Sequence, residues 1–127
     1  MKLASSILLA VLALAGCDNP VVPSSDLISA RSSNQTLQIT NDTDNPVYYF
    51  VAERGTLALL DWAVCTDPTD GRCKSVAAHA TAQISYESIV GPAEKGSKVV
   101  VYHWRLIPAG AAKFEADSIR SLVVNLE

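Results

Sequence analysis

The stretch KVVVYHWRL, residues 98–106, decides the fold class of this 127-residue chain. It is dominated by β-branched and aromatic residues, which fit the pleated surface of a strand. Successive side chains of a strand point to opposite faces. One alternating set is then Val100, Tyr102, Trp104 and Leu106, and the other is Val99, Val101, His103 and Arg105. The stretch therefore predicts a β-strand.

Further stretches follow the same period of two. TLQIT (36–40) places Leu37 and Ile39 on one face. VYYFVA (47–52) is apolar on both faces, which is typical of a central strand. AQISYE (82–87) and SLVVNL (121–126) alternate as well. Because the strands are short, separated by turn residues and not alternated with helices, we expect an all-β fold, an antiparallel β-sandwich of about seven strands.

Three connecting segments are less regular. TLALLDWAV (56–64) fits a strand with Ala58, Leu60, Trp62 and Val64 inward, or a short helix. Propensity does not decide between the two for so short a segment. NDTDNP (41–46) is typical of a turn, and PAGAAKFEA (108–116) predicts a loop with one helical turn.

The N-terminus carries an apolar run, SILLAVLALAGCDNP (6–20). Its apolar core is shorter than the roughly 20 residues that a helix needs to cross a bilayer. Lys2 precedes the run and small residues follow it, which is the order of a secretory signal peptide. We therefore expect residues 1–16 to be removed.

The end of this run, Leu14-Ala15-Gly16-Cys17, resembles the lipobox of bacterial lipoproteins at all four positions. The resemblance implies a diacylglyceryl thioether on Cys17, cleavage before it and acylation, commonly with palmitate, of the new N-terminus. Two or more acyl chains hold a protein stably to a membrane. The expected location is the bacterial cell envelope, on the periplasmic side if the host has two membranes. The alternative is an ordinary secreted protein.

Asp18 resembles the inner-membrane retention signal of enterobacterial lipoproteins, but the choice between inner and outer membrane stays open. Residues 17–35, rich in Ser, Pro, Asn and Asp, are predicted to be a lipidated N-terminus with a flexible tether, and residues 36–127 the sandwich domain. From Cys17 on, nine Lys and Arg face 13 Asp and Glu, and the basic residues form no cluster. Nucleic acid is therefore excluded as a partner.

Cysteine usage predicts one disulfide. With Cys17 assigned to lipid, Cys65 and Cys73 remain as a pair in a compartment that permits oxidation. The residues between them, TDPTDGR, are turn formers, so a small ring closes easily. The alternative, a redox or metal pair, lacks the C-x-x-C spacing and a nearby His.

A second resemblance extends over most of residues 36–106. ITNDTDNPVYYFVAE, DWAVC, ISYESI and VVVYHW are similar to stretches of small uncharacterised bacterial lipoproteins whose single domain is an immunoglobulin-like sandwich. The resemblance implies that fold and no established activity.

Catalysis is not expected. A nucleophile needs an oriented His beside it, and the chain has two His, no G-x-S-x-G motif and cysteines that are expected to be oxidised or lipidated. His79 and His103 are candidates for weak copper or zinc binding, against a simpler assignment of His79 to a loop and His103 to an exposed strand end. No metal or other cofactor is expected.

The aromatic residues of two strands, with the adjoining His, form a candidate binding surface of Tyr48, Tyr49, Tyr102, His103 and Trp104. Aromatic side chains are favoured contact residues, but core or framework packing is the simpler explanation for them. The expected function is a lipid-anchored, non-catalytic binding or structural module, with an envelope protein as its partner. The alternative is an inhibitor-like domain that presents the Cys65–Cys73 loop to an envelope protease.

Overall fold

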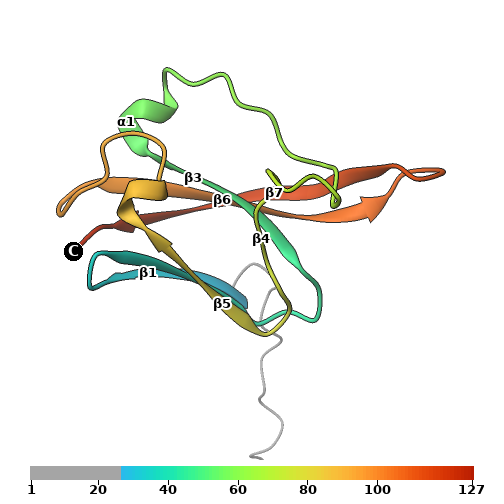
Figure 1. Cartoon of the computed structure of the whole chain (residues 1–127), viewed down its shortest axis with the longest axis horizontal. Coiled ribbons are helices and arrows are strands. Elements are labelled where there is room, and N and C mark those ends of the chain that lie inside the picture. The colour runs from blue at the N-terminus through green and yellow to red at the C-terminus, as the bar shows by residue number, and fades with distance from the viewer. Residues whose placement is uncertain (1–26) are drawn as a thin grey trace, which may run out of the picture.

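The computed structural model describes residues 27–127, which form two antiparallel sheets packed face to face (Figure 1). The predicted leader and Cys17 lie outside the described residues. One sheet has the strand order β1-β2-β5 and the other β4-β3-β6-β7. The strands are β1 (Ile28–Ser33), β2 (Thr36–Asn41), β3 (Val47–Glu53), β4 (Ser75–Val76), β5 (Ala80–Ser85), β6 (Lys98–Pro108) and β7 (Phe114–Asn125).

This arrangement confirms the predicted β-sandwich. The strands β1, β2 and β5 take the places of A, B and E of an immunoglobulin-like fold, and β4, β3, β6 and β7 take those of C′, C, F and G. The disulfide differs from that of antibody domains, because it closes a loop between β3 and β4 and does not join the two sheets. None of the helices among the described residues is long and apolar enough to cross a membrane.

The core lies between the sheets and follows the predicted alternation. Leu37 and Ile39 of β2 are fully buried, as expected for the inward face of that strand. They face Val51 of β3 and Val99 and Val101 of β6. As predicted, β3 is a central strand, since it pairs with β6 along one side and with β4 and Val90 along the other.

The domain begins earlier than predicted. Residues 28–33, assigned to the tether, form β1, which pairs with β2 over six residues. Asn34 and Gln35 join the two strands, and both have positive φ (51° and 62°), the conformation of a two-residue hairpin turn. Ile28 is buried in the core. Strand β1 therefore belongs to the sandwich, and the predicted start of the domain at residue 36 is too late.

Residues 56–64 are neither of the two predicted alternatives. A four-residue helix, α1 (Arg54–Leu57), is capped by the Glu53 carboxylate, which accepts from the backbone N–H of Thr56 at 2.7 Å. These capping bonds also hold the pKa of Glu53 below its usual range. Beyond α1 the chain has no regular structure as far as β4. Residues 58–74, which we call the strap, arch over the outer face of the four-stranded sheet (Figure 1).

The segment 108–116 is also different from the prediction. Strand β7 already begins at Phe114, and a tight turn with positive φ at Gly110 and Ala112 connects it to β6. The β6–β7 hairpin extends past the rest of the sandwich, at the right in Figure 1. The pairing register shifts between His103 and Arg105, where Ser118 has a φ of 49°. This is a β-bulge, which bends the hairpin locally.

The two sheets are joined at a corner by Asn41, whose side chain is fully buried. Its Nδ2 donates to the carbonyl oxygens of Asn45 (2.8 Å), Val76 (3.1 Å) and Ala77 (3.2 Å). Its Oδ1 accepts from the backbone N–H and the hydroxyl of Thr43. One amide thus organises the β2–β3 turn and ties it to the β4–β5 connection, two of the three places where the chain crosses between the sheets.

We predict that Asn41→Ala lowers the free energy of unfolding by about 3 kcal/mol, because buried carbonyl oxygens lose their donors. Asn45→Ala is the matched control. It lies in the same turn, but only its backbone is used, so we expect a change within about 0.5 kcal/mol. Urea denaturation followed by tryptophan fluorescence measures both. Equal effects of the two substitutions would contradict the role assigned to Asn41.

Candidate functional site

The outer face of the four-stranded sheet carries a cluster of aromatic side chains. Pairing of β3 with β6 sets Tyr48 opposite Trp104 and Phe50 opposite Tyr102. Side chains opposite one another on an antiparallel pair are close enough to pack. The four residues therefore form one apolar surface on the side of the sheet that does not face the core.

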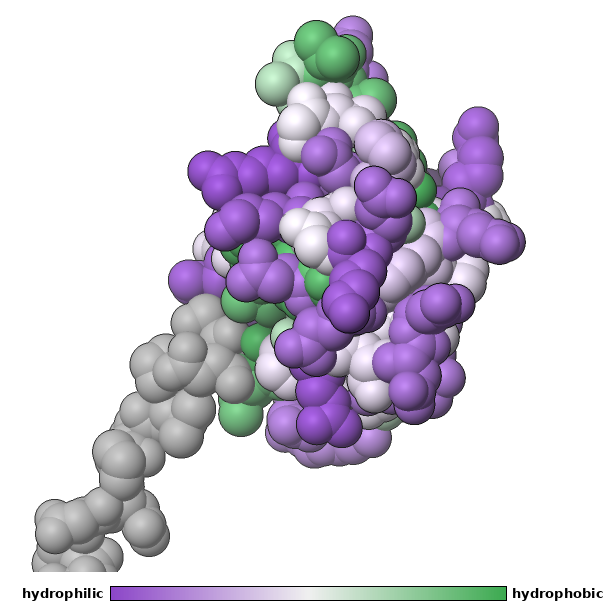
Figure 2. Space-filling view, turned by 90° about the vertical axis from the view of Figure 1, so that its left-hand side faces the viewer, coloured by the Kyte–Doolittle hydropathy of each residue, from purple (hydrophilic) through white to green (hydrophobic). Residues whose placement is uncertain are grey.

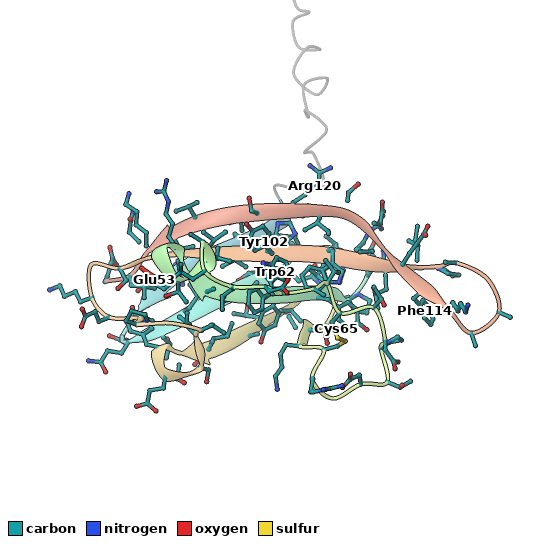
Figure 3. All side chains as sticks on the ribbon, turned by 90° about the horizontal axis from the view of Figure 1, so that it is seen from above. Glu53, Trp62, Cys65, Tyr102, Phe114 and Arg120 are labelled. Carbon is teal, nitrogen blue, oxygen red and sulfur yellow. A yellow bond between two sulfur atoms is a disulfide. The ribbon has the colours of Figure 1, made fainter. Side chains whose placement is uncertain are left out.

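The strap covers this surface through Trp62. Its ring stacks on Phe50 with a centroid distance of 4.5 Å and lies 4.9 Å from Tyr102 and 6.2 Å from Trp104. Figure 3 shows Trp62 next to Tyr102 near the middle of the sheet. The indole Nε1 of Trp104 donates to the carbonyl oxygen of Cys65 at 3.0 Å. The strap is thus fixed to the sheet both by stacking and by a hydrogen bond.

The predicted disulfide joins Cys65 and Cys73, whose Cα atoms are 5.5 Å apart. Turn chemistry explains the two aspartates in the ring, as expected. Asp67 Oδ1 accepts from the backbone N–H (2.9 Å) and hydroxyl (2.7 Å) of Thr69. The Asp70 carboxylate accepts from the Arg72 side chain at 3.1 and 3.0 Å and from its backbone N–H. The resulting loop, residues 66–72, is exposed apart from partly buried Asp70.

The hydrogen bonds of these turns also lower the pKa values of the two aspartates. The Thr69 side chain, followed by its backbone N–H, holds the pKa of Asp67 below its usual range. The Arg72 side chain does the same for the pKa of Asp70. Both carboxylates are therefore charged, and their main acceptor sites are occupied, at neutral pH. In the chain-entropy model, closing a ring of this size stabilises the fold by about 2.5 kcal/mol.

The structure divides the predicted aromatic binding surface between two faces. Tyr48, Tyr102 and Trp104 belong to the outer face under the strap, whereas Tyr49 and His103 point to the inner face. Trp104 is buried, and burial raises the pKa of the Tyr49 hydroxyl. These five residues do not form one exposed surface. Sequence reasoning did not include Trp62 among them, although its position in the strap is what joins the outer-face aromatics.

The two histidines have different environments. His79 is exposed, and its Nε2 lies 2.7 Å from Asp44 Oδ1. His103 is only 4% exposed, so the expectation of an exposed strand-end residue is wrong. It is buried because its side chain is on the inner face of β6. Burial, together with the charge of Arg120, lowers the pKa of His103, and the imidazole is therefore neutral at pH 7.

Within the described part of the chain, neither histidine belongs to a group of three potential metal ligands. Among residues 27–127, one group of three potential ligands lies close enough to share an ion, and it consists of Cys65, Asp70 and Cys73. Its two sulfur atoms are already bonded to each other. The described geometry therefore gives no support to copper or zinc binding through His79 and His103.

The face of the molecule shown in Figure 2 is mostly polar. In the side view of Figure 2, apolar residues gather at the top, the end at which α1 and the strap lie in Figure 1. Leu59 of the strap is 86% exposed, the most exposed large apolar residue in the described part of the chain. Single exposed apolar residues are common on soluble domains.

Comparisons with known protein families, with curated proteins and with solved structures give no match to this chain.

We predict that Trp62→Ala lowers the free energy of unfolding by about 2 to 3 kcal/mol, because the strap loses its main contact with the sheet. Leu59→Ala changes an exposed strap residue and should stay within about 0.5 kcal/mol. Urea denaturation measures stability, and hydrogen exchange of strap amides measures local opening. Unchanged exchange in Trp62→Ala would show that the disulfide alone holds the strap.

Proposed function

We propose that this chain is a lipid-anchored, non-catalytic binding module of the bacterial envelope, which presents the disulfide ring Cys65–Cys73 to a protein partner. The observation that carries the proposal is the support beneath the ring, the Trp62 stack on the sheet and the bond from Trp104 to the Cys65 carbonyl. A lipid on Cys17, implied by the lipobox, would hold the domain at the membrane.

Rigidity of the ring favours binding. Association costs about 0.5 to 1.5 kcal/mol for each flexible side chain that becomes fixed. In this ring, Asp67, Thr69, Asp70 and Arg72 already form hydrogen bonds with one another. Much of the ordering cost is therefore met by the fold before any partner arrives, while Thr66 and Pro68 remain exposed for contact.

The inhibitor-like alternative differs from this proposal in how the ring would contact its partner. The backbone of the ring turns twice, with hydrogen bonds from Asp70 N to Asp67 O (3.1 Å) and from Cys73 N to Asp70 O (2.9 Å). Proteins that take up a peptide by strand addition need it extended. Consecutive turns thus favour docking of the ring as a rigid convex surface over insertion of an extended segment into a protease cleft.

The lipid anchor is tested in the native host. We expect mass spectrometry of the mature protein to show loss of residues 1–16 and a diacylglyceryl group on Cys17, because the lipobox directs both steps. Cys17→Ser should leave the membrane fraction, while a Cys65→Ser, Cys73→Ser variant should stay in it. An unmodified Cys17 thiol or an uncut leader would contradict the anchor.

The partner surface is tested by photo-crosslinking of the full chain in the host envelope. A photoreactive residue at Thr66, in the ring, should yield a discrete adduct at least fivefold more abundant than one at Gln83, on the exposed side of β5. Trp62→Ala should reduce the adduct, because the ring loses its support. Equal adducts from both positions, or none from Thr66, would overturn the proposed surface and leave the lipid anchor unaffected.

A further inference from the structure

A cavity of about 320 Å³ opens at the end of the sandwich where the β6–β7 hairpin continues past the other sheet. Its inner wall carries His103 and Arg105 of β6 and Asp117 and Arg120 of β7. The β2–β3 turn, residues 42–45, forms the opposite rim. This volume is in the range of sites for small molecules.

His103 is a buried polar side chain whose hydrogen-bonding groups have no partner among the described residues. Although it is 96% buried and lines the cavity, its imidazole forms no hydrogen bond with any described residue. A buried polar group without a partner costs free energy. The neutral ring offers one donor and one acceptor. A ligand in the cavity would supply the missing partner.

Arg120 adds a positive charge next to this histidine. The two residues are directly opposite each other in the β6–β7 register, and the charge of Arg120 contributes to lowering the pKa of His103. Within residues 27–127, Arg120 has no carboxylate in ion-pair distance, whereas Arg105 is held by Asp117 at 2.9 Å. The free guanidinium and the imidazole together suit a carboxylate.

The opposite rim is negative. Asp42 and Asp44 lie on the β2–β3 turn, and both line the cavity. Asp44 is in contact with exposed His79, and Asp42 has no ion-pair partner in the described part of the chain. A simple anion would meet repulsion from this rim. An ammonium group on the same ligand would instead be attracted by it.

We propose that this cavity binds a small zwitterionic ligand, a free amino acid or a dipeptide, with its carboxylate at Arg120 and His103 and its ammonium at Asp42 and Asp44. The apolar part of such a ligand would contact Ile28 and Val47, which also line the cavity. This site is separate from the disulfide ring and does not depend on the proposed function of the ring.

Calorimetric titration of the purified full chain tests the site. The probes are L-alanine and L-alanyl-L-alanine, the N-acetyl and amide derivatives of the dipeptide, and inorganic phosphate. We expect at least one of the two zwitterions to bind, each dipeptide derivative to bind at least tenfold more weakly than the better zwitterion, and phosphate to bind more weakly still. If the N-acetyl derivative or phosphate binds as tightly as the zwitterions, the zwitterion assignment is wrong. If no probe binds, the site itself is overturned.

Arg120→Gln should weaken binding of the zwitterion at least tenfold. Arg31→Gln, an exposed β1 residue outside the cavity, should leave it unchanged. A second readout uses the wild-type protein alone. Because a bound carboxylate favours the imidazolium form, NMR titration should show a higher pKa for His103 with ligand than without it. An unchanged His103 titration, or full binding by Arg120→Gln, would overturn the proposal.

Discussion

The central strands β3 and β6 carry apolar side chains on both faces, and both faces therefore have to be covered. Burying apolar surface contributes about 25 cal/mol per Å², so an exposed aromatic face would forfeit much of the stability of a small domain. The three-stranded sheet covers the inner face through Leu37 and Ile39. Among residues 27–127, no further strand covers the outer face. The strap does so instead, with Trp62 stacked on Phe50 and Tyr102.

Because the strap covers the outer face, its own rigidity also bears on the proposed function of the ring. A segment that covers a sheet without regular structure needs other constraints, and the strap has a disulfide and a hydrogen bond from Trp104 to Cys65. The stability of the outer face and the rigidity of the exposed loop are thus coupled, because the same contacts provide both. The cavity has a different origin. It forms where the long β6–β7 hairpin continues beyond its partner sheet, and inner-face residues such as His103 and Arg105 then line a space between the sheets.

The sequence predicted the parts of the fold that alternate strongly. Leu37 and Ile39 are buried as expected, and the fold class and the disulfide are confirmed. Strand β1 was missed because its Ser and Arg residues have the composition of a linker. Its signals were the alternation of Ile28 with Ala30 and the two turn residues at Asn34 and Gln35. The first half of β7 was missed because its small residues lack β-propensity, and pairing with β6 overrides that preference.

The sequence by itself determined that residues 98–106 form a strand with two defined side-chain sets, and that Cys65 and Cys73 are near enough to bond. A period of two separates the sets, but it does not say which one faces the core when both are apolar. Only packing against the second sheet decided that Val99, Val101 and His103 point inward. The burial of His103, the division of the aromatic residues and the path of the strap all follow from that choice, because they depend on contacts between segments far apart in the chain.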